Sequence, residues 1–73
     1  AEIVTLTEWI GKNLIELNLR QKYGVNVIAI KRGGSLIINP PASEPTKKGD
    51  LFMLLGLNST LKKIASMNVS RKN

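Results

Sequence analysis

Two apolar segments around a pair of glycines constrain the fold of this 73-residue chain more than any other feature. Residues 25–30 (VNVIAI) are apolar on both faces, which is typical of a strand at the centre of a sheet. Gly33 and Gly34 follow, and two glycines in sequence suit a tight hairpin turn before the β-prone residues 36–38 (LII). Residues 51–55 (LFMLL) form another doubly apolar segment, which Gly56 ends. The sequence therefore predicts a small sheet with a hairpin and two strands buried on both faces.

The segment before this hairpin has the features of a helix with too much apolar surface. Asn13 is a candidate N-cap for a helix from about residue 14 to residue 23, and Gly24 is suited to a left-handed conformation after its end. Asn18 is a poor helix former, which predicts a bend there. The apolar residues form two separate stripes, namely Ile10, Leu14 and Leu17, and Ile15, Leu19 and Tyr23. A sheet covers one stripe, so the second requires the rest of the domain or a second copy of the chain.

The remaining segments complete the predicted order of elements. Residues 2–6 predict a first strand, and Asn58 or Ser59 is expected to cap a last helix. Residues 39–45 contain three prolines, which lack the N–H that a sheet requires, so this segment is an extended surface connection. The predicted fold is a small α+β domain of order β-α-β-β-β-α with a mixed or antiparallel sheet. We expect it to dimerise through helix and strand surfaces, with residues 1–68 as the domain and residues 69–73 as a fraying polar tail.

Composition limits the ways in which so short a chain is stabilised. A domain of this size buries only roughly 60% of its surface, and without cysteine no disulfide can help, so oligomerisation is the remaining device. No apolar run approaches the roughly 20 residues that span a bilayer. The chain begins directly with an apolar segment, and we expect it to be a fragment of a larger protein. The net charge of +6 is spread over short pairs of basic residues, which are typical of a solvated surface, so a nucleic-acid partner is not expected.

The residues that usually perform catalysis or bind metals are scarce. The chain has no histidine and no cysteine, and its five acidic residues are scattered in sequence, so we predict neither enzyme activity nor a metal site. Glu16 is expected to pair with Arg20 on an exposed helix face, four residues further on. Asp50, after Gly49, is expected to cap a turn. Gly33 and Gly34 open no helix and lack the further glycines of a phosphate-binding loop.

Residues 17–34 (LNLRQKYGVNVIAIKRGG) resemble the most recognisable core of the TrkA C-terminal domain, also called the RCK C-terminal domain. Residues 9–14 (WIGKNL) are similar to the opening "GKSL" of that family. Residues 39–40 (NP) and 48–51 (KGDL) resemble its closing pattern. The resemblance covers most of the chain up to residue 68, and it is strongest to the Ktr-type branch.

The resemblance implies a function and a site. Domains of this family are non-catalytic regulatory modules of potassium channels and transporters. They follow a Rossmann-type domain, dimerise, and lie in the cytoplasm beside the inner membrane, to which a transporter subunit holds them. In the Ktr-type branch they bind cyclic di-AMP between two copies, which is associated with reduced potassium uptake. The resemblance implies ribose-phosphate contacts for Arg20 and Asn26, adenine contacts for Leu14, Leu19 and Val27, and a packing role for Pro41, or for Pro40 if the register differs.

Other interpretations stay open on the sequence alone. Judged without the resemblance, Arg20 pairs with Glu16, and Asn26 bonds to nearby backbone. The chain could be a plain dimerisation module with another ligand or none, or a basic domain that contacts nucleic acid. The same type of domain also occurs in other hosts, such as cation/proton antiporters and transcription regulators.

Overall fold

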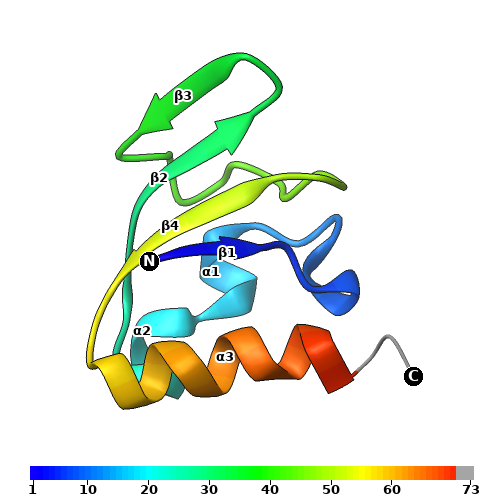
Figure 1. The fold of residues 1–73 in the computed structure, drawn as a ribbon. Coiled ribbons are helices and arrows are strands. Elements are labelled where there is room, and N and C mark those ends of the chain that lie inside the picture. The colour runs from blue at the N-terminus through cyan, green and yellow to red at the C-terminus, as the bar shows by residue number, and fades with distance from the viewer. Residues whose placement is uncertain (71–73) are drawn as a thin grey trace.

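The computed structural model describes the backbone of residues 1–70 and the side chains of residues 1–67. It has the predicted α+β architecture, with a four-stranded sheet and helices against it (Figure 1). The elements follow the predicted order, except that a 3-10 turn follows the first strand and the first predicted helix is two helices. They are β1 (Glu2–Val4), η1 (Thr7–Trp9), α1 (Leu14–Leu17), α2 (Leu19–Tyr23), β2 (Asn26–Arg32), β3 (Ser35–Ile38), β4 (Leu51–Leu55) and α3 (Asn58–Ser70).

The sheet is antiparallel throughout and has the strand order β1-β4-β2-β3. The two doubly apolar segments are therefore its central strands, as the sequence predicts. β2 and β3 are joined by the predicted two-residue turn, because Arg32 pairs with Ser35 across it. Gly33 takes a φ of 59° in that turn, a conformation that glycine adopts at little cost.

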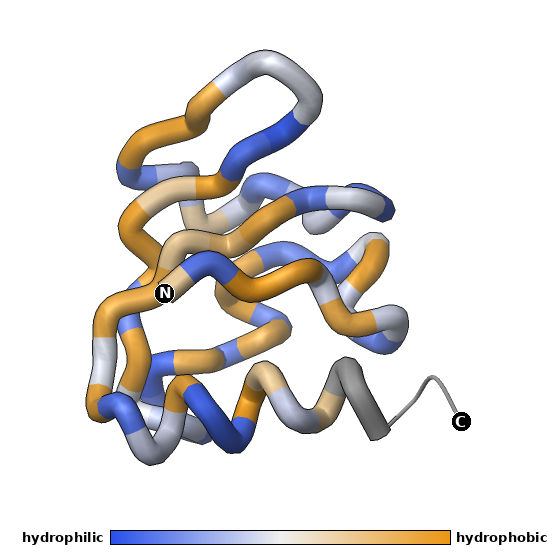
Figure 2. Tube along the Cα trace, viewed as in Figure 1, coloured by the Kyte–Doolittle hydropathy of each residue, from blue (hydrophilic) through white to orange (hydrophobic). Residues whose placement is uncertain are grey.

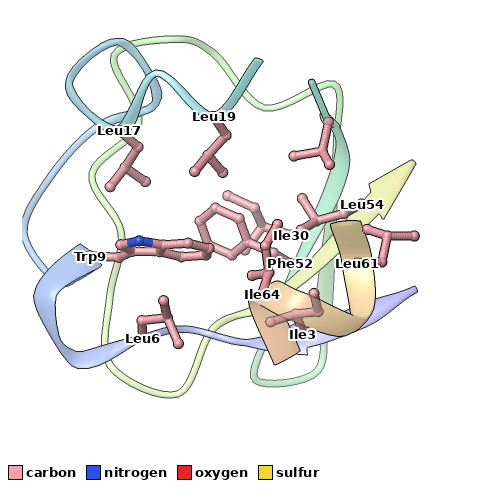
Figure 3. Close-up of a cluster of buried hydrophobic side chains, with 11 residues drawn as sticks. Ile3, Leu6, Trp9, Leu17, Leu19, Ile30, Phe52, Leu54, Leu61 and Ile64 are labelled. Atoms are coloured by element: carbon pink, nitrogen blue, oxygen red, sulfur yellow. The ribbon is translucent and has the colours of Figure 1, made fainter. Parts of the chain in front are cut away.

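The hydrophobic core lies between the helices and one face of the sheet. Ile3, Phe52 and Ile30 form one row across three strands, and each is at most 4% exposed. The Trp9 ring packs against that of Phe52, with 5.4 Å between ring centroids. Figure 3 shows these side chains meeting the apolar side chains of the helices, which are Leu17, Leu19, Leu61 and Ile64.

The opposite face of the sheet is exposed at its β3 edge and at the end of β4 in the single chain. Leu36 is 50% exposed, Ile38 66% and Leu55 60%. Figure 2 shows hydrophobic stretches continuing along the β2–β3 hairpin, away from α3. On β2 and β4 this face is buried in part, since Ala29 is 2% exposed and Met53 is half-buried, whereas Leu55 is exposed. The expectation that β2 and β4 are covered on both faces is therefore confirmed only in part for one copy. The physical reason is that the buried apolar residues of the helices all belong to one cluster with one face of the sheet, so these helices do not cover the other face.

The first predicted helix is interrupted at Asn18, so one continuous helix from residue 14 to residue 23 is wrong, whereas the predicted bend is confirmed. Asn18 takes a left-handed conformation with φ 48° and ψ 44°. Asn13 is the predicted N-cap, since its side chain accepts a hydrogen bond from Glu16 N at 2.9 Å. Gly24 has the predicted left-handed conformation with φ 68°. The interruption also corrects the two stripes, because Leu17 and Leu19 both face the core while Ile15 is 67% exposed.

The last helix begins at Asn58 and continues through Ser70. Residues 69 and 70, expected in a polar tail, are therefore helical, because the backbone of the last helix continues past the predicted domain boundary at residue 68. Residues 71–73 of that predicted tail lie outside the described residues. Among the helices that the structure describes, none is long and apolar enough to cross a membrane.

Candidate functional site

A hollow of about 360 Å³ lies where α1 and α2 meet the beginning of β2. It contains five of the six residues that the family resemblance implies, together with two that sequence reasoning missed. The implied residues are Leu14, Leu19, Arg20, Asn26 and Val27, and the two others are Val25 and Ala42. Pro41 is exposed and does not line the hollow, but it is the direct neighbour of Ala42.

Two backbone irregularities bring the apolar walls together. The left-handed Asn18 separates α1 from α2, so Leu14 and Leu19 line the same hollow from two short helices. On the sheet side, a bulge in β2 lies between Val27, which pairs with Leu54, and Ala29, which pairs with Met53. A bulge changes the direction of the side chains that precede it. Here Val27 pairs with the buried Leu54, and Val27 itself is half-buried in the wall of the hollow.

Arg20 and Asn26 provide the polar groups of the hollow, and both are exposed. The predicted pair between Glu16 and Arg20 is wrong: in the described part of the chain no ion pair joins these two side chains. The reason is the interruption at Asn18, since four-residue spacing brings side chains together only along a continuous helix. Glu16 instead accepts a hydrogen bond from Asn13 N at 3.0 Å, which completes the capping box of α1.

The proline-rich connection closes the hollow beside α1. The carbonyl oxygen of Ala42 accepts hydrogen bonds from Leu14 N at 3.1 Å and Ile15 N at 3.4 Å. These amides lie in the first turn of α1, where no carbonyl of the same helix can serve them. The connection therefore completes the helix, and in doing so it places Ala42 at the hollow.

The described side chains include a partly buried ionic cluster, formed by Arg32, Glu44 and Asp50, which we name the Arg32 cluster. Asp50 accepts from Arg32 Nε at 3.0 Å and Nη2 at 2.8 Å, and Glu44 accepts from Arg32 Nη1 at 2.6 Å. The guanidinium holds the pKa of the Asp50 carboxyl below its ordinary value, and the two carboxylates raise the pKa of Arg32. Asp50 also accepts from Lys47 N at 2.9 Å, which confirms its predicted role in the turn.

A second hollow, of about 120 Å³, shares Leu19 with the first. Its charged lining residues are two acidic and two basic ones, namely Glu8, Glu16, Lys12 and Lys22. Ligand sites usually measure roughly 300–1,000 Å³, so this hollow is small for a ligand and the larger one is the candidate site. In the part of the chain that the structure describes, no three potential metal-ligating acids come together.

Exposed apolar residues adjoin the larger hollow. Ile15 follows Leu14 and is 67% exposed, and Ile28 follows Val27 and is 41% exposed. Leu55, which is 60% exposed, pairs with Asn26 across the sheet. These residues come from a helix and two strands, the kinds of surface expected to meet a second copy.

Comparisons with known proteins agree with the fold and the motifs. The Ktr system potassium uptake protein C of Bacillus subtilis is 40% identical over 55 residues, which is 75% of this chain. The chain spans 25% of the length of that relative.

Two solved structures have the same fold. One is the RCK C domain of the potassium transport protein KtrA in complex with cyclic di-AMP. Its TM-score is 0.85 with 31% identity, over 92% of this chain and 79% of that one. The other is an RCK_C domain dimer of S. agalactiae BusR in complex with the same dinucleotide. Its TM-score is 0.77 with 25% identity, over 92% of this chain and 95% of that one.

The family assignment depends on the whole domain and not on isolated motifs. Residues 1–67 match the sequence profile of the TrkA-C domain, from the first strand to the last helix. This chain belongs to the TrkA-C domain family, whose solved members include RCK C-terminal domains.

Proposed function

We propose that this chain is a cytoplasmic ligand-sensing domain that binds cyclic di-AMP between two copies and regulates potassium transport. The observation that carries the proposal is the position of Leu14, Leu19, Arg20, Asn26 and Val27 around one hollow. These residues come from three elements, so their sequence spacing alone does not bring them together. The KtrA domain that is 31% identical to this chain was solved in complex with this dinucleotide, which supports the proposal.

The chemistry of the hollow fits such a ligand. Cyclic di-AMP has two-fold symmetry and two negative phosphates, so a symmetric pair of chains offers one guanidinium to each phosphate. Leu14, Leu19 and Val27 supply apolar surface for the bases, and the amide of Asn26 supplies both a donor and an acceptor. The volume of about 360 Å³ is that of a small ligand site, which suits a ligand shared between two copies.

The second copy is expected to cover the exposed apolar residues beside the hollow. Ile15, Ile28 and Leu55 together provide apolar surface from α1, β2 and β4. Burial of apolar surface is the main driving force of association, at roughly 25 cal/mol per Å². The BusR domain, which was solved as a dimer with the dinucleotide, supports the same arrangement.

Regulation would follow because binding of the ligand is coupled to the relative orientation of the two copies. A dinucleotide that contacts both copies favours one relative orientation of the pair, by as much as its affinity differs between orientations. In the full-length protein a Rossmann-type domain and a membrane potassium transporter subunit would receive this change. The potassium uptake protein C of Bacillus subtilis, of which the chain spans 25%, supports this host.

A calorimetric titration with cyclic di-AMP tests the site. Arg20→Ala should weaken binding on the order of tenfold to hundredfold, because it removes a charged hydrogen-bond donor from a phosphate. Lys22→Ala is the matched control, since it removes the same charge from α2 but from a residue that does not line the larger hollow. Its affinity should stay within about threefold of the parent chain.

Two results would overturn the proposal. The first is a parent chain that gives no heat and no shift in melting temperature with the dinucleotide, which would leave a plain dimerisation module. The second is a salt-sensitive complex with DNA or RNA and none with the dinucleotide, which would favour a nucleic-acid contact domain.

A further inference from the structure

We infer that Arg32, which lies outside the hollow, is a positioning residue for the ligand site because it fixes the loop that carries Pro41 and Ala42. The inference rests on the proposed function, since it concerns how the dinucleotide site keeps its shape. Sequence alone places Arg32 in a short basic pair with Lys31, which is typical of a solvated surface. The structure places the two neighbours in different ion pairs.

Arg32 uses most of its hydrogen-bonding capacity within the chain. Its guanidinium donates to both carboxylate oxygens of Asp50, to Glu44 Oε2 and, at 3.1 Å, to the carbonyl oxygen of Pro45. The Arg32 side chain is 23% exposed, that of Glu44 26% and that of Asp50 1%. A guanidinium has five N–H donors in a fixed plane, so four directed bonds define the position of whatever accepts them.

A single turn of the loop connects the residues that Arg32 binds to the wall of the hollow. Glu44 N donates to the carbonyl oxygen of Pro41 at 2.9 Å, so residues 41–44 form a turn. Ala42 lies inside this turn and lines the hollow, and its carbonyl oxygen accepts from Leu14 N. Arg32 therefore fixes one end of the turn through Glu44, and the amide of Leu14 in α1 fixes its middle through Ala42.

The loop needs such support because its own sequence supplies little. Three of the residues between β3 and β4 are prolines, which donate no backbone hydrogen bond. On the α1 side, Thr46 N donates to the carbonyl oxygen of Lys12, and Gly11 N donates to that of Thr46. On the β2 side, the side chain of Arg32 makes the bonds to Glu44 and Pro45.

A matched pair of variants tests the inference. Glu44→Ala removes one carboxylate from the Arg32 cluster, and Glu2→Ala removes one from the ion pair with the neighbouring Lys31, in which both side chains are 45% exposed. Both variants change the net charge equally, so long-range attraction of the anionic dinucleotide changes alike. Glu44→Ala should bind cyclic di-AMP about five- to tenfold more weakly than Glu2→Ala, because the loop must then be ordered on binding.

Hydrogen exchange at Leu14 N and Ile15 N supplies a readout that needs no ligand, since both amides donate to Ala42. Exchange should be faster in Glu44→Ala than in Glu2→Ala, while the amides in β4 exchange alike in both variants. Equal exchange at Leu14 and Ile15 in the two variants would overturn the inference, as would equal affinity where binding occurs. If the parent chain binds no dinucleotide, the proposed function fails, and the exchange comparison still decides whether Arg32 positions the loop.

Discussion

At the scale of single residues, the least expected finding is that Asp50 combines a local and a distant role. Its place after Gly49 predicts the turn contact with Lys47, because that contact lies within the same short segment. Its pairing with Arg32 spans 18 residues and joins β2 to the far end of the loop. A buried charge requires a partner, but the sequence contains 11 basic residues and does not identify which one is folded beside it.

Asp50→Asn should lower the free energy of unfolding by about 3 kcal/mol at pH 7, because it removes the charge that compensates a partly buried guanidinium. The hydrogen bonds from the Arg32 guanidinium depress the folded-state pKa of Asp50 below its ordinary value. Its contribution is therefore fully present above the unfolded-state pKa, about 3.9, and is lost as the pH falls through the lower folded-state value.

Urea unfolding of both chains from pH 7 down to the acid range measures this contribution. The difference between parent chain and variant should be constant above about pH 5 and should shrink at lower pH. A difference that is small at pH 7, or that grows on acidification, would contradict the assigned role of Asp50.

At the scale of elements, local sequence signals predict most of the helices, strands and turns. The parts that they do not predict are irregularities of the backbone and contacts between distant segments. The hairpin at Gly33, the N-cap at Asn13 and the left-handed Gly24 follow from residue types with strong backbone preferences. The bulge at Ile28 could not be predicted, because residues 25–30 are apolar on nearly every position and no alternation marks a change of face. The loop contact of Ala42 likewise depends on tertiary structure, which no local pattern encodes.

The interruption at Asn18 is the element-scale feature on which the candidate site depends, because it directs Leu14 and Leu19 into the same hollow. Asn18→Ala should cost about 1 kcal/mol of unfolding free energy, since a side chain without a local hydrogen bond disfavours the left-handed region. Asn18→Gly should leave the free energy of unfolding nearly unchanged. Glycine adopts positive φ freely, and this gain offsets the loss of the hydrogen bond from Asn18 Nδ2 to Gln21 Oε1.

Thermal unfolding of the two variants checks this prediction, and helical content by circular dichroism distinguishes the two possible backbones. An Asn18→Ala chain that is more stable than the parent and gains helix would mean that α1 and α2 can join into one helix. The left-handed residue would then not be required by the fold.

At the scale of the whole molecule, the single chain is incomplete in one respect. The helices cover one face of the sheet, while Leu36, Ile38 and Leu55 remain at least half exposed on β3 and β4. A chain of 73 residues without disulfides has little stability to spare, so a second copy that covers apolar surface would add what the core lacks. The sequence indicates this need through its excess of apolar positions, whereas the pairing of two copies around a shared ligand comes from the family resemblance and stays a proposal.

Sedimentation equilibrium of the chain, with and without cyclic di-AMP, measures whether two copies associate and whether the dinucleotide holds them together. We expect a reversible pair of chains that binds one dinucleotide and dissociates less readily in its presence, because a ligand that contacts both copies stabilises their association. Single chains at every concentration, whether or not the dinucleotide is present, would contradict it.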